Sequence, residues 1–513
     1  MKRRGSMGDS CHQTFRFSPA MPIHSHLANQ GTYPMRHVKI VATIGPATSS
    51  PESLKRLLYA GINVARFNMS HGNADWHRTT IQLLRQLALD EKTPLAILVD
   101  LAGPKIRVGD LPGEGILLQQ GRNVVLVTKS ESQHPISPQN ESREVLPVNL
   151  PHFPDGMKPG QIVLIDDGNM SLTVENQETN RLICKVLVGG TVTSHKGVNF
   201  PGLPLDISGF TQKDADDLQV AIDVEADYVA LSFVRSPQDI HTLQRALADR
   251  SALIPLIAKI ERPEALTCLD EILDAADGVM VARGDLALEM SPEEVPLLQK
   301  QIIAQANRMG KPVITATQML ESMTRNAFPT RAEASDVANA VLDGTDAVML
   351  SAETSMGNFP VESVQVMDRI IRQAEKEMFR QSQNLISPKG IVRSTPEAVC
   401  EAAVSLATSV DAQAIVVFTE SGHTAMLLAR HRPTVQIIAL TPSPTVTRQL
   451  TLVWGMVSYV FPQIDDTDER INAAQDHLKT LGLLHEGRLI IIVTGERLGH
   501  AFGTNIIKAH LVV

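Results

Sequence analysis

The feature that most constrains the fold is a series of eight short apolar runs separated by stretches of helical period. The runs are rich in Val, Ile, Leu and Ala and are continuous rather than alternating, which is typical of parallel strands buried on both faces. They span residues 38–44, 64–67, 95–99, 228–232, 256–260, 278–282, 312–316 and 347–350. Amphipathic stretches such as 53–60, 76–89, 237–248 and 295–307 predict helices between them.

Most of these runs follow one another at roughly 22 to 35 residues, the length of one strand-helix unit, so eight units predict a closed (β/α)8 TIM barrel. The third and fourth runs are roughly 130 residues apart, about four times that unit, which indicates an inserted domain. Within the insertion, Pro and Gly punctuate β-rich runs at 123–127, 161–165 and 182–188, as expected of a small β-barrel or sandwich.

A second strand-helix series follows the barrel. A long helical pattern at 361–380 and a polar linker at 381–389 precede predicted strands at 414–418, 436–440, 457–461 and 489–493. We therefore predict four parts. They are a disordered leader over 1–36, a barrel over 37–104 and 207–380, an inserted β domain over 105–206, and a C-terminal α/β domain over 390–513.

Composition excludes several classes of protein. The formal charge is −9 and no basic stretch extends beyond residues 2–4, which argues against a nucleic-acid surface. The four cysteines form no CxxC pair, so neither a disulfide frame nor a structural zinc site is indicated. No apolar run approaches the ~20 residues of a membrane span. We expect a cytoplasmic protein that binds no membrane.

Polar residues gather just past the predicted strands, where barrel enzymes carry their catalytic groups. In a closed barrel they would form one mouth, in which Glu261 and Asp285 offer hard oxygen ligands for Mg²⁺ or Mn²⁺. Lys259 and Arg66 would hold phosphate oxygens there. Any one of these residues taken alone also fits a solvated cap or an ion pair. Thr317 fits turn geometry as well as catalysis.

Longer motifs give the chain a family resemblance. They are 43–46 (TIGP), 63–72 (NVARFNMSHG), 259–261 (KIE), 281–286 (VARGDL), 315–323 (TATQMLESM), 329–333 (PTRAE) and 343–354 (DGTDAVMLSAET). With these motifs in this order, the chain resembles the pyruvate kinase family from about residue 38 to its C-terminus. Neither a P-loop nor the motif set of protein kinases is present, so a nucleotide would be held differently.

The resemblance implies phosphoryl transfer from phosphoenolpyruvate to ADP in the last step of glycolysis, followed by protonation of the enolate of pyruvate. It implies Mg²⁺ or Mn²⁺ on Glu261 and Asp285, with a second Mg²⁺ arriving with the nucleotide. The catalytic residues it implies are Arg66, Lys259, Thr317, Arg107, Ser351 and Glu353. Substrate would also contact Ser232, Ala282, Arg283, Gly284 and Asp285, partly through backbone amides. Thr317 would act through a water relay.

The inserted domain resembles the family's lid. The resemblance assigns the nucleotide to Thr43, Pro46, Asn68, His71, Arg107 and Lys196.

One position departs from the family. Many members bind K⁺ and have a glutamate where this chain has Lys105, and Leu101, Ala102 and Val108 also differ. We hypothesise that the Lys105 ammonium replaces K⁺, which would then not be required. Asn68, Ser70 and Asp100 would be the remains of the cation pocket. The alternative is an exposed lid lysine.

The C-terminal domain carries a candidate effector loop between a strand and a helix. Its residues are Thr419, Ser421, Gly422, His423 and Thr424, and in the family this loop binds phosphorylated effectors. Glu420 and Glu496 would repel a second phosphate, so a sugar monophosphate or AMP is favoured over fructose 1,6-bisphosphate. An unliganded structural cap is the alternative. The family also suggests a homotetramer.

Two other functions fit the mouth. One is a Mg²⁺-dependent barrel lyase or aldolase acting on phosphoenolpyruvate or pyruvate, and the other is a catalytically inactive metabolite sensor. Formation of ATP from phosphoenolpyruvate and ADP would separate both from a kinase.

Overall fold

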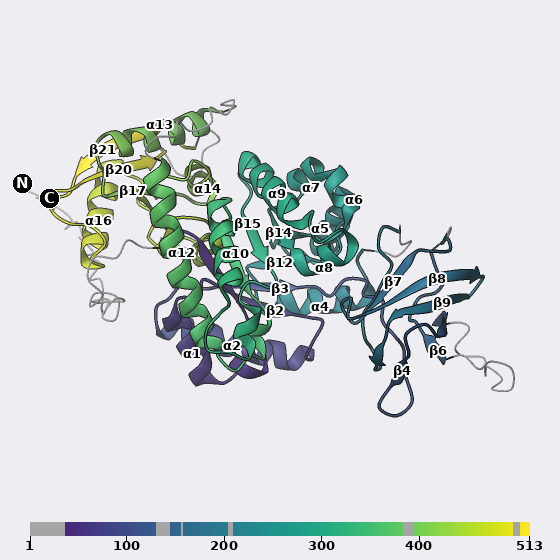
Figure 1. Cartoon of the computed structure of the whole chain (residues 1–513). Helices are drawn as coiled ribbons and strands as arrows, with labels where there is room; N and C mark the ends of the chain where they lie inside the picture. Colours follow the sequence, from purple (N-terminus) through teal and green to yellow (C-terminus); the bar gives the residue numbers. More distant parts are fainter. Residues whose placement is uncertain (1–35, 130–143, 155–156, 204–208, 383–393, 496–502) are drawn as a thin grey trace, which may run out of the picture.

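The structure, a computed structural model, describes residues 36–129, 144–154, 157–203, 209–382, 394–495 and 503–513. Figure 1 shows a barrel wrapped in helices in the middle, the C-terminal sheet on the left and the inserted sheets on the right. The predicted leader lies outside the described residues except for Arg36, and most of the predicted linker at 381–389 also does. In the described part of the chain, no helix is both long and apolar enough to cross a membrane.

Eight parallel strands close the barrel in the order β1-β16-β15-β14-β13-β12-β3-β2. They are β1 Lys39–Thr43, β2 Val64–Asn68, β3 Ala96–Asp100, β12 Tyr228–Leu231, β13 Leu256–Ile260, β14 Gly278–Ala282, β15 Val313–Ala316 and β16 Ala347–Leu350. All eight were predicted, each within one residue of its observed ends. Their side chains are buried on both faces, which explains the continuous apolar runs.

Helices cover the outside of the barrel. The larger ones are α1 Pro51–Ala60, α2 Ala74–Asp90, α4 Gln212–Asp223, α5 Pro237–Ala248, α9 Val295–Met309, α10 Arg331–Leu342 and α12 Pro360–Ser382. Shorter pieces are α6 Pro263–Thr267, α7 Leu269–Ala275, α8 Arg283–Glu289, α11 Ala352–Ser355, η1 Pro46–Thr48 and η2 Glu321–Thr324. Local signals set the ends: Ser50 caps α1 by accepting from the Ser53 amide, and Gly61 ends it at a φ of 96°.

The insertion is β-rich, as predicted. Strands β5 Asn123–Val127, β6 Glu144–Pro147, β7 Ile162–Ile165, β8 Met170–Glu178, β9 Arg181–Val188 and β11 Val198–Asn199 form one sheet, and β4 Ile116–Leu118 pairs with β10 Gly190–Val192. The edge strands of the larger sheet are β11 and β6. Bridges from Arg107 to Gly197 and from Val108 to Val148 reach residues next to both edges, so the sheet curls toward a small barrel.

The C-terminal domain has a five-stranded sheet in the order β19-β18-β17-β20-β21. Four strands were predicted, namely β17 Ala414–Phe418, β18 Gln436–Thr441, β19 Met456–Val460 and β20 Leu489–Thr494. The fifth, β21 Ile506–Leu511, pairs antiparallel with β20 and was missed. The helices are α13 Thr395–Ser409, α14 His423–Arg430, α15 Pro444–Gln449, α16 Thr467–Thr480 and η3 Leu450–Leu452.

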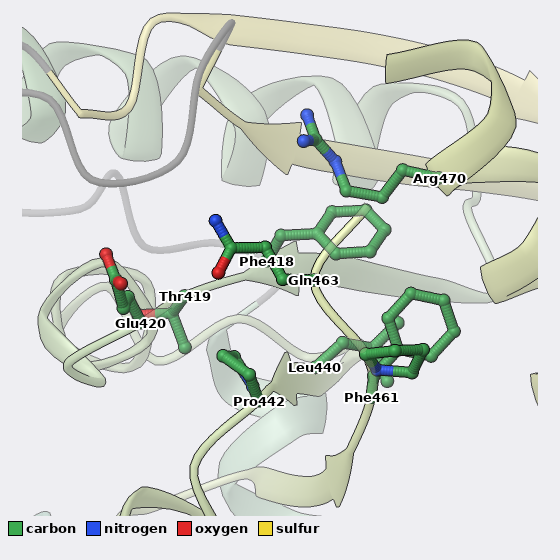
Figure 2. Close-up of a pocket in the computed structure, with 9 residues that line it drawn as sticks. Phe418, Thr419, Glu420, Leu440, Pro442, Phe461, Gln463 and Arg470 are labelled. Carbon is green, nitrogen blue, oxygen red and sulfur yellow. The ribbon is translucent and has the colours of Figure 1, made fainter. Parts of the chain in front are cut away.

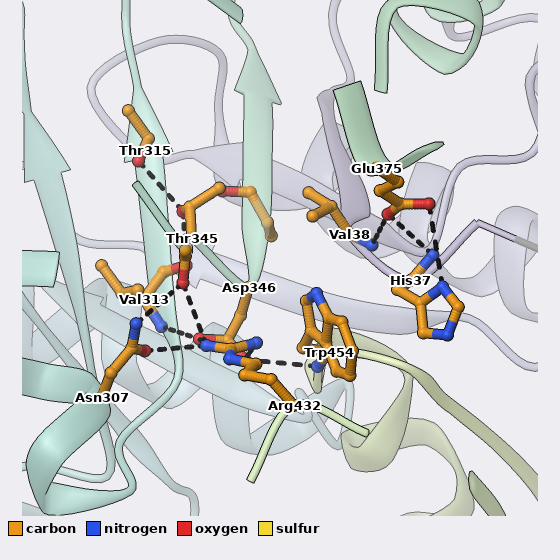
Figure 3. A network of polar contacts seen from close by, with 12 residues as sticks. His37, Val38, Asn307, Val313, Thr315, Thr345, Asp346, Glu375, Arg432 and Trp454 are labelled. Atoms are coloured by element: carbon orange, nitrogen blue, oxygen red, sulfur yellow. Dashed lines mark hydrogen bonds and ion pairs between the residues drawn. The ribbon is translucent and has the colours of Figure 1, made fainter. Parts of the chain in front are cut away.

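The C-terminal domain closes the floor of the barrel, at the end opposite the mouth. Leu452 of η3 is fully buried in the cluster formed by the inward-facing barrel side chains. Beside it, Nη1 and Nη2 of Arg432 each donate 2.9 Å to the carboxylate of Asp346, and Arg432 stacks on Trp454 (Figure 3). The two domains are therefore joined by apolar packing and by a two-pronged ion pair.

Candidate functional site

Lys259, at the carboxyl end of β13, is the centre of a charged cluster in the barrel mouth. Its Nζ donates 2.7 Å to Ser232 Oγ and lies 3.2 Å from Asp100 Oδ1 and 3.0 Å from Glu261 Oε1. Burial opposes the charged ammonium, but Asp100 and Glu261 outweigh it and raise the pKa of Lys259. The mouth therefore holds a permanently positive group.

Arg66, from β2, is the second cation of the mouth. Its Nε donates 2.7 Å to Asp100 Oδ2 and its Nη1 donates 3.0 Å to Thr43 Oγ1. Burial alone would raise the pKa of Asp100, but Lys259 and Arg66 outweigh burial and hold it below its ordinary value. Asp100 therefore stays ionised and orients the side chains of both Arg66 and Lys259.

Glu261 has one carboxylate oxygen engaged and one available. Oε2 accepts from the Phe233 amide at 2.7 Å. Oε1 faces Lys259 as an ion pair, yet among the described residues no hydrogen bond is aimed at it. Burial, partly offset by Lys259, raises the pKa of Glu261, and the charge of Asp285 raises it further. A buried oxygen without a hydrogen bond, near a second carboxylate, suits a divalent cation.

These residues fit the metal that the sequence predicts. Among the described residues no group of three or more His, Cys, Asp or Glu side chains could hold a metal ion, and the site predicted from the sequence needs only two protein ligands. Mg²⁺ is commonly held by one or two carboxylates together with waters and substrate oxygens. Glu261 and Asp285 provide that donor set.

Thr317 lies opposite this cluster in an uncommon backbone conformation. Its φ is 66° and that of Gln318 is 55°, both in the left-handed region. The Thr317 hydroxyl accepts from the Gly284 amide at 2.7 Å and donates 2.6 Å to the Ala316 carbonyl. It is thus fixed against the first turn of α8, which carries Asp285.

The side chains of two predicted site residues, Arg283 and Glu353, form hydrogen bonds to backbone groups rather than face the mouth. The side chain of Arg283 pairs with Asp336 at 2.7 Å and donates 2.7 Å to the Thr317 carbonyl, so it anchors the Thr317 turn from behind. Glu353 is fully buried and accepts from the amides of Leu320 at 3.0 Å and Ser351 at 2.7 Å. The Ser351 hydroxyl is buried and has no hydrogen bond within the described residues.

A cavity of about 300 Å³ opens between the mouth and the inserted domain. Of the predicted residues, it is lined by His71, Lys105, Arg107, Lys196 and Asp285. Burial, with Lys105 and Arg107 adding to it, lowers the pKa of His71. Among the predicted nucleotide residues, Thr43, Pro46 and Asn68 do not line this cavity.

The cationic lid residues have protein partners or are exposed. Lys196 pairs with Asp166 at 2.6 Å, and Arg107 donates 2.7 Å to the His195 carbonyl. Lys105 is exposed at the cavity edge. Its ammonium makes no hydrogen bond or ion pair within the described residues, and so does not contact Asn68, Ser70 or Asp100 as predicted for a K⁺ substitute.

Both threonine hydroxyls of the predicted effector loop already have hydrogen-bond partners within the protein. Thr419 Oγ1 accepts from the Gly422 amide at 3.0 Å, and Thr424 Oγ1 lies 2.5 Å from Thr504 Oγ1. Glu420, Ser421 and His423 are exposed. The cavity beside the loop is about 10 Å³, the size of one water, and Figure 2 shows Glu420 and Thr419 on one side and Arg470 on the other.

Sequence reasoning missed several charged residues on the cavity wall, namely Asp166, Asp167, Arg235, Arg262 and Glu289. Of these, Arg262 and Glu289 form a buried ion pair of 2.9 Å. The sequence offered one signal for this pair: Arg262 directly follows Glu261, and Glu289 lies one helical turn after Asp285.

Comparisons with known proteins agree with this geometry. A family model described as "Pyruvate kinase, barrel domain" matches residues 35–364, and one described as "Pyruvate kinase, alpha/beta domain" matches 397–510. Pyruvate kinase 2 of Synechocystis sp. is 43% identical over 93% of this chain and 79% of its own. The pyruvate kinase of Agrobacterium vitis is 42% identical over 92% of this chain and 97% of its own. A crystal structure of a pyruvate kinase from Cryptosporidium parvum aligns with a TM-score of 0.84 at 35% identity, covering 93% of this chain and 96% of that one.

Proposed function

This chain belongs to the pyruvate kinase family, and we propose that Lys259 and Arg66 stabilise the phosphoryl group during transfer at the barrel mouth. The chain is a phosphotransferase that makes pyruvate and ATP from phosphoenolpyruvate and ADP. One observation supports this assignment most: a buried, permanently charged ammonium lies among Asp100, Glu261 and Ser232. Such a group is already oriented for the charge that develops on the moving phosphoryl group, so little reorganisation is needed.

The metal site proposed for Glu261 and Asp285 completes this arrangement. A divalent ion bound there would neutralise phosphoryl and enolate oxygens as a Lewis acid. Glu261 binds best as a carboxylate, and Lys259 beside it favours that form. Arg66 and Lys259 would then keep the substrate phosphate in line for transfer.

The proton that converts the enolate to pyruvate would be delivered near Thr317. The Thr317 hydroxyl is fixed by hydrogen bonds with the Gly284 amide and the Ala316 carbonyl. A hydroxyl is itself a poor acid at neutral pH. We therefore assign Thr317 the orientation of a water that delivers the proton. The backbone amides around Arg283, Gly284 and Asp285, at the start of α8, would bind the substrate carboxylate, and the Gly284 amide would then exchange its hydrogen bond to Thr317 for one to substrate.

The nucleotide would enter the cavity between mouth and lid, where His71, Arg107 and Lys196 bring positive or neutral groups to its phosphates. Closure of the inserted domain would exclude water from the transfer. Thr43, Pro46 and Asn68 would contact the nucleotide only after such a closure.

Independence from K⁺ is a proposal that rests on charge. Lys105 adds a positive charge at the cavity edge, where it adds to the effect of burial in lowering the pKa of His71. Asp100 already has two cationic partners, Arg66 and Lys259. In the closed state the Lys105 ammonium would turn inward toward Asn68 and Ser70.

Regulation through the C-terminal domain is also proposed, with a sugar monophosphate or AMP as effector and a homotetramer as the assembly. The packing supports a route to the barrel. A Cβ on Gly422 would lie 3.3 Å from Leu450, so the loop rests on the segment that places Leu452 in the barrel floor. The cytoplasmic location stays a prediction.

The test is ATP formation from phosphoenolpyruvate and ADP, measured in Mg²⁺ with glucose 6-phosphate, AMP or fructose 1,6-bisphosphate added separately. We expect ATP in all reactions and activation by one of the two monophosphates. A barrel lyase or an inactive sensor would make no ATP, and activation by the bisphosphate alone would contradict the proposed effector class.

A further inference from the structure

Arg262 and Glu289 tie together the two segments that carry the proposed metal ligands. Arg262 directly follows Glu261 at the end of β13, and Glu289 lies four residues after Asp285 on α8. Arg262 Nη1 lies 2.9 Å from Glu289 Oε1, with the two side chains 4% and 2% exposed. The pair therefore connects the Glu261 segment to the Asp285 helix.

The ion pair lies just beyond the point where hydrogen bonding between β13 and β14 ends. Pairing between β13 and β14 ends at Ile260 and Val281, so Glu261 and Asp285 both lie beyond the last paired residues. Their separation then depends on side-chain and helix contacts. A buried, bidentate-capable guanidinium is well suited to fix such a separation.

The same pair also holds the returning end of the inserted domain. Arg262 Nη2 donates 2.8 Å to the Leu203 carbonyl, and Glu289 Oε1 accepts from Asn199 Nδ2 at 3.4 Å. Both charged residues line the cavity between lid and mouth. Glu289 Oε2 is buried there without a hydrogen bond among the described residues.

From this arrangement we infer that Arg262 and Glu289 are positioning residues that set the spacing of Glu261 and Asp285 and thereby the affinity of the mouth for a divalent cation. The inference rests on the proposed metal role of Glu261 and Asp285. Removing Arg262 leaves Glu289 as a buried charge without its ion-pair partner, and removing Glu289 leaves Arg262 with Glu264, at 3.0 Å, as its remaining carboxylate partner. Either change breaks the charged link between the Glu261 segment and the Asp285 helix. Residues that orient metal ligands typically contribute 10-fold to 100-fold to affinity.

A purely structural role predicts something different. In that case loss of the pair lowers the melting temperature but leaves the affinity of the folded protein for metal unchanged. Direct metal binding by the folded chain separates the two roles, because it does not depend on turnover.

The experiment titrates the full, metal-free chain with Mn²⁺ alone, followed by electron paramagnetic resonance. The test variants are Arg262→Met and Glu289→Gln, and the second keeps the side-chain shape should the first fail to fold. Arg262→Lys is the conservative variant. The matched control is Arg85→Met, which removes a 3.0 Å ion pair with buried Asp227 at the other end of the barrel.

We expect the Mn²⁺ dissociation constant to rise roughly 10-fold in Arg262→Met and Glu289→Gln and to recover largely in Arg262→Lys. Arg85→Met should lower the melting temperature and leave the constant within about twofold. Unchanged Mn²⁺ binding in both test variants would overturn the inference, provided Asp285→Asn loses binding. Unchanged binding in Asp285→Asn would instead overturn the proposed metal site.

Discussion

The ammonium of Lys39 donates a hydrogen bond of 2.6 Å to the carbonyl oxygen of Met456, across the floor of the barrel. Burial, reinforced by the charge of Arg36 and opposed by Glu375 and Asp346, lowers the pKa of Lys39 from its ordinary 10.5 to about 7. Burial and the charge of Arg36 thus bring the pKa of this barrel lysine close to neutral pH, while the C-terminal domain accepts its hydrogen bond.

This burial predicts a pH dependence of stability. Because the unfolded chain binds the Lys39 proton up to a higher pH, stability should rise between about pH 7 and 10, by roughly 1.4 kcal/mol per pH unit at most. Lys39→Met should lose that part of the rise. Unfolding in urea at pH 7 and 9 measures it, with Lys55→Met, at a side chain that is 44% exposed, as the control. Equal pH slopes in wild type and Lys39→Met would contradict the assignment.

Leu452 should contribute stability out of proportion to its place in a short 3-10 turn. It is fully buried among the inward-facing barrel residues, so Leu452→Ala would leave a cavity in the floor at a cost of roughly 2 to 5 kcal/mol. Thermal unfolding measures the loss. Val460→Ala, on a side chain that is 51% exposed, should change it little.

We expect substitution of Glu353 to lower the stability of the protein rather than to affect catalysis directly. Glu353→Ala would leave the buried amides of Leu320 and Ser351 without their acceptor, at roughly 2 to 4 kcal/mol in all. Glu353→Gln, which keeps one acceptor oxygen, should lose less. A variant with wild-type melting temperature and a large loss of kcat would instead support the catalytic role predicted from the sequence.

The proposed role of Lys105 predicts the response to K⁺. Replacing NaCl by KCl at constant ionic strength should change wild-type turnover less than about twofold, because the ammonium supplies the charge. Lys105→Glu should create a requirement for K⁺. Many-fold activation of the wild-type chain by KCl would reject the proposal.

The barrel could be predicted because its strands are buried on both faces and so leave continuous apolar runs, as in Leu256–Ile260. Strand β21 could not, since it is an edge strand whose side chains are half-buried or exposed. Acidic residues at the strand ends could be identified in the sequence. The sequence does not show that Glu353 accepts hydrogen bonds from backbone amides, while Glu261 Oε1 accepts none and forms an ion pair with Lys259. That difference, like the contact between Arg262 and Glu289, depends on side-chain direction beyond the strand ends.

The most direct test of the central claim is turnover by Lys259→Met, measured as ATP formed from phosphoenolpyruvate and ADP at saturating Mg²⁺. Circular dichroism and thermal unfolding would verify that the variant is folded. The account predicts a loss of kcat of roughly 10³-fold or more, because a preoriented charge at the phosphoryl group is removed. A folded variant that retains a tenth or more of wild-type turnover would contradict it.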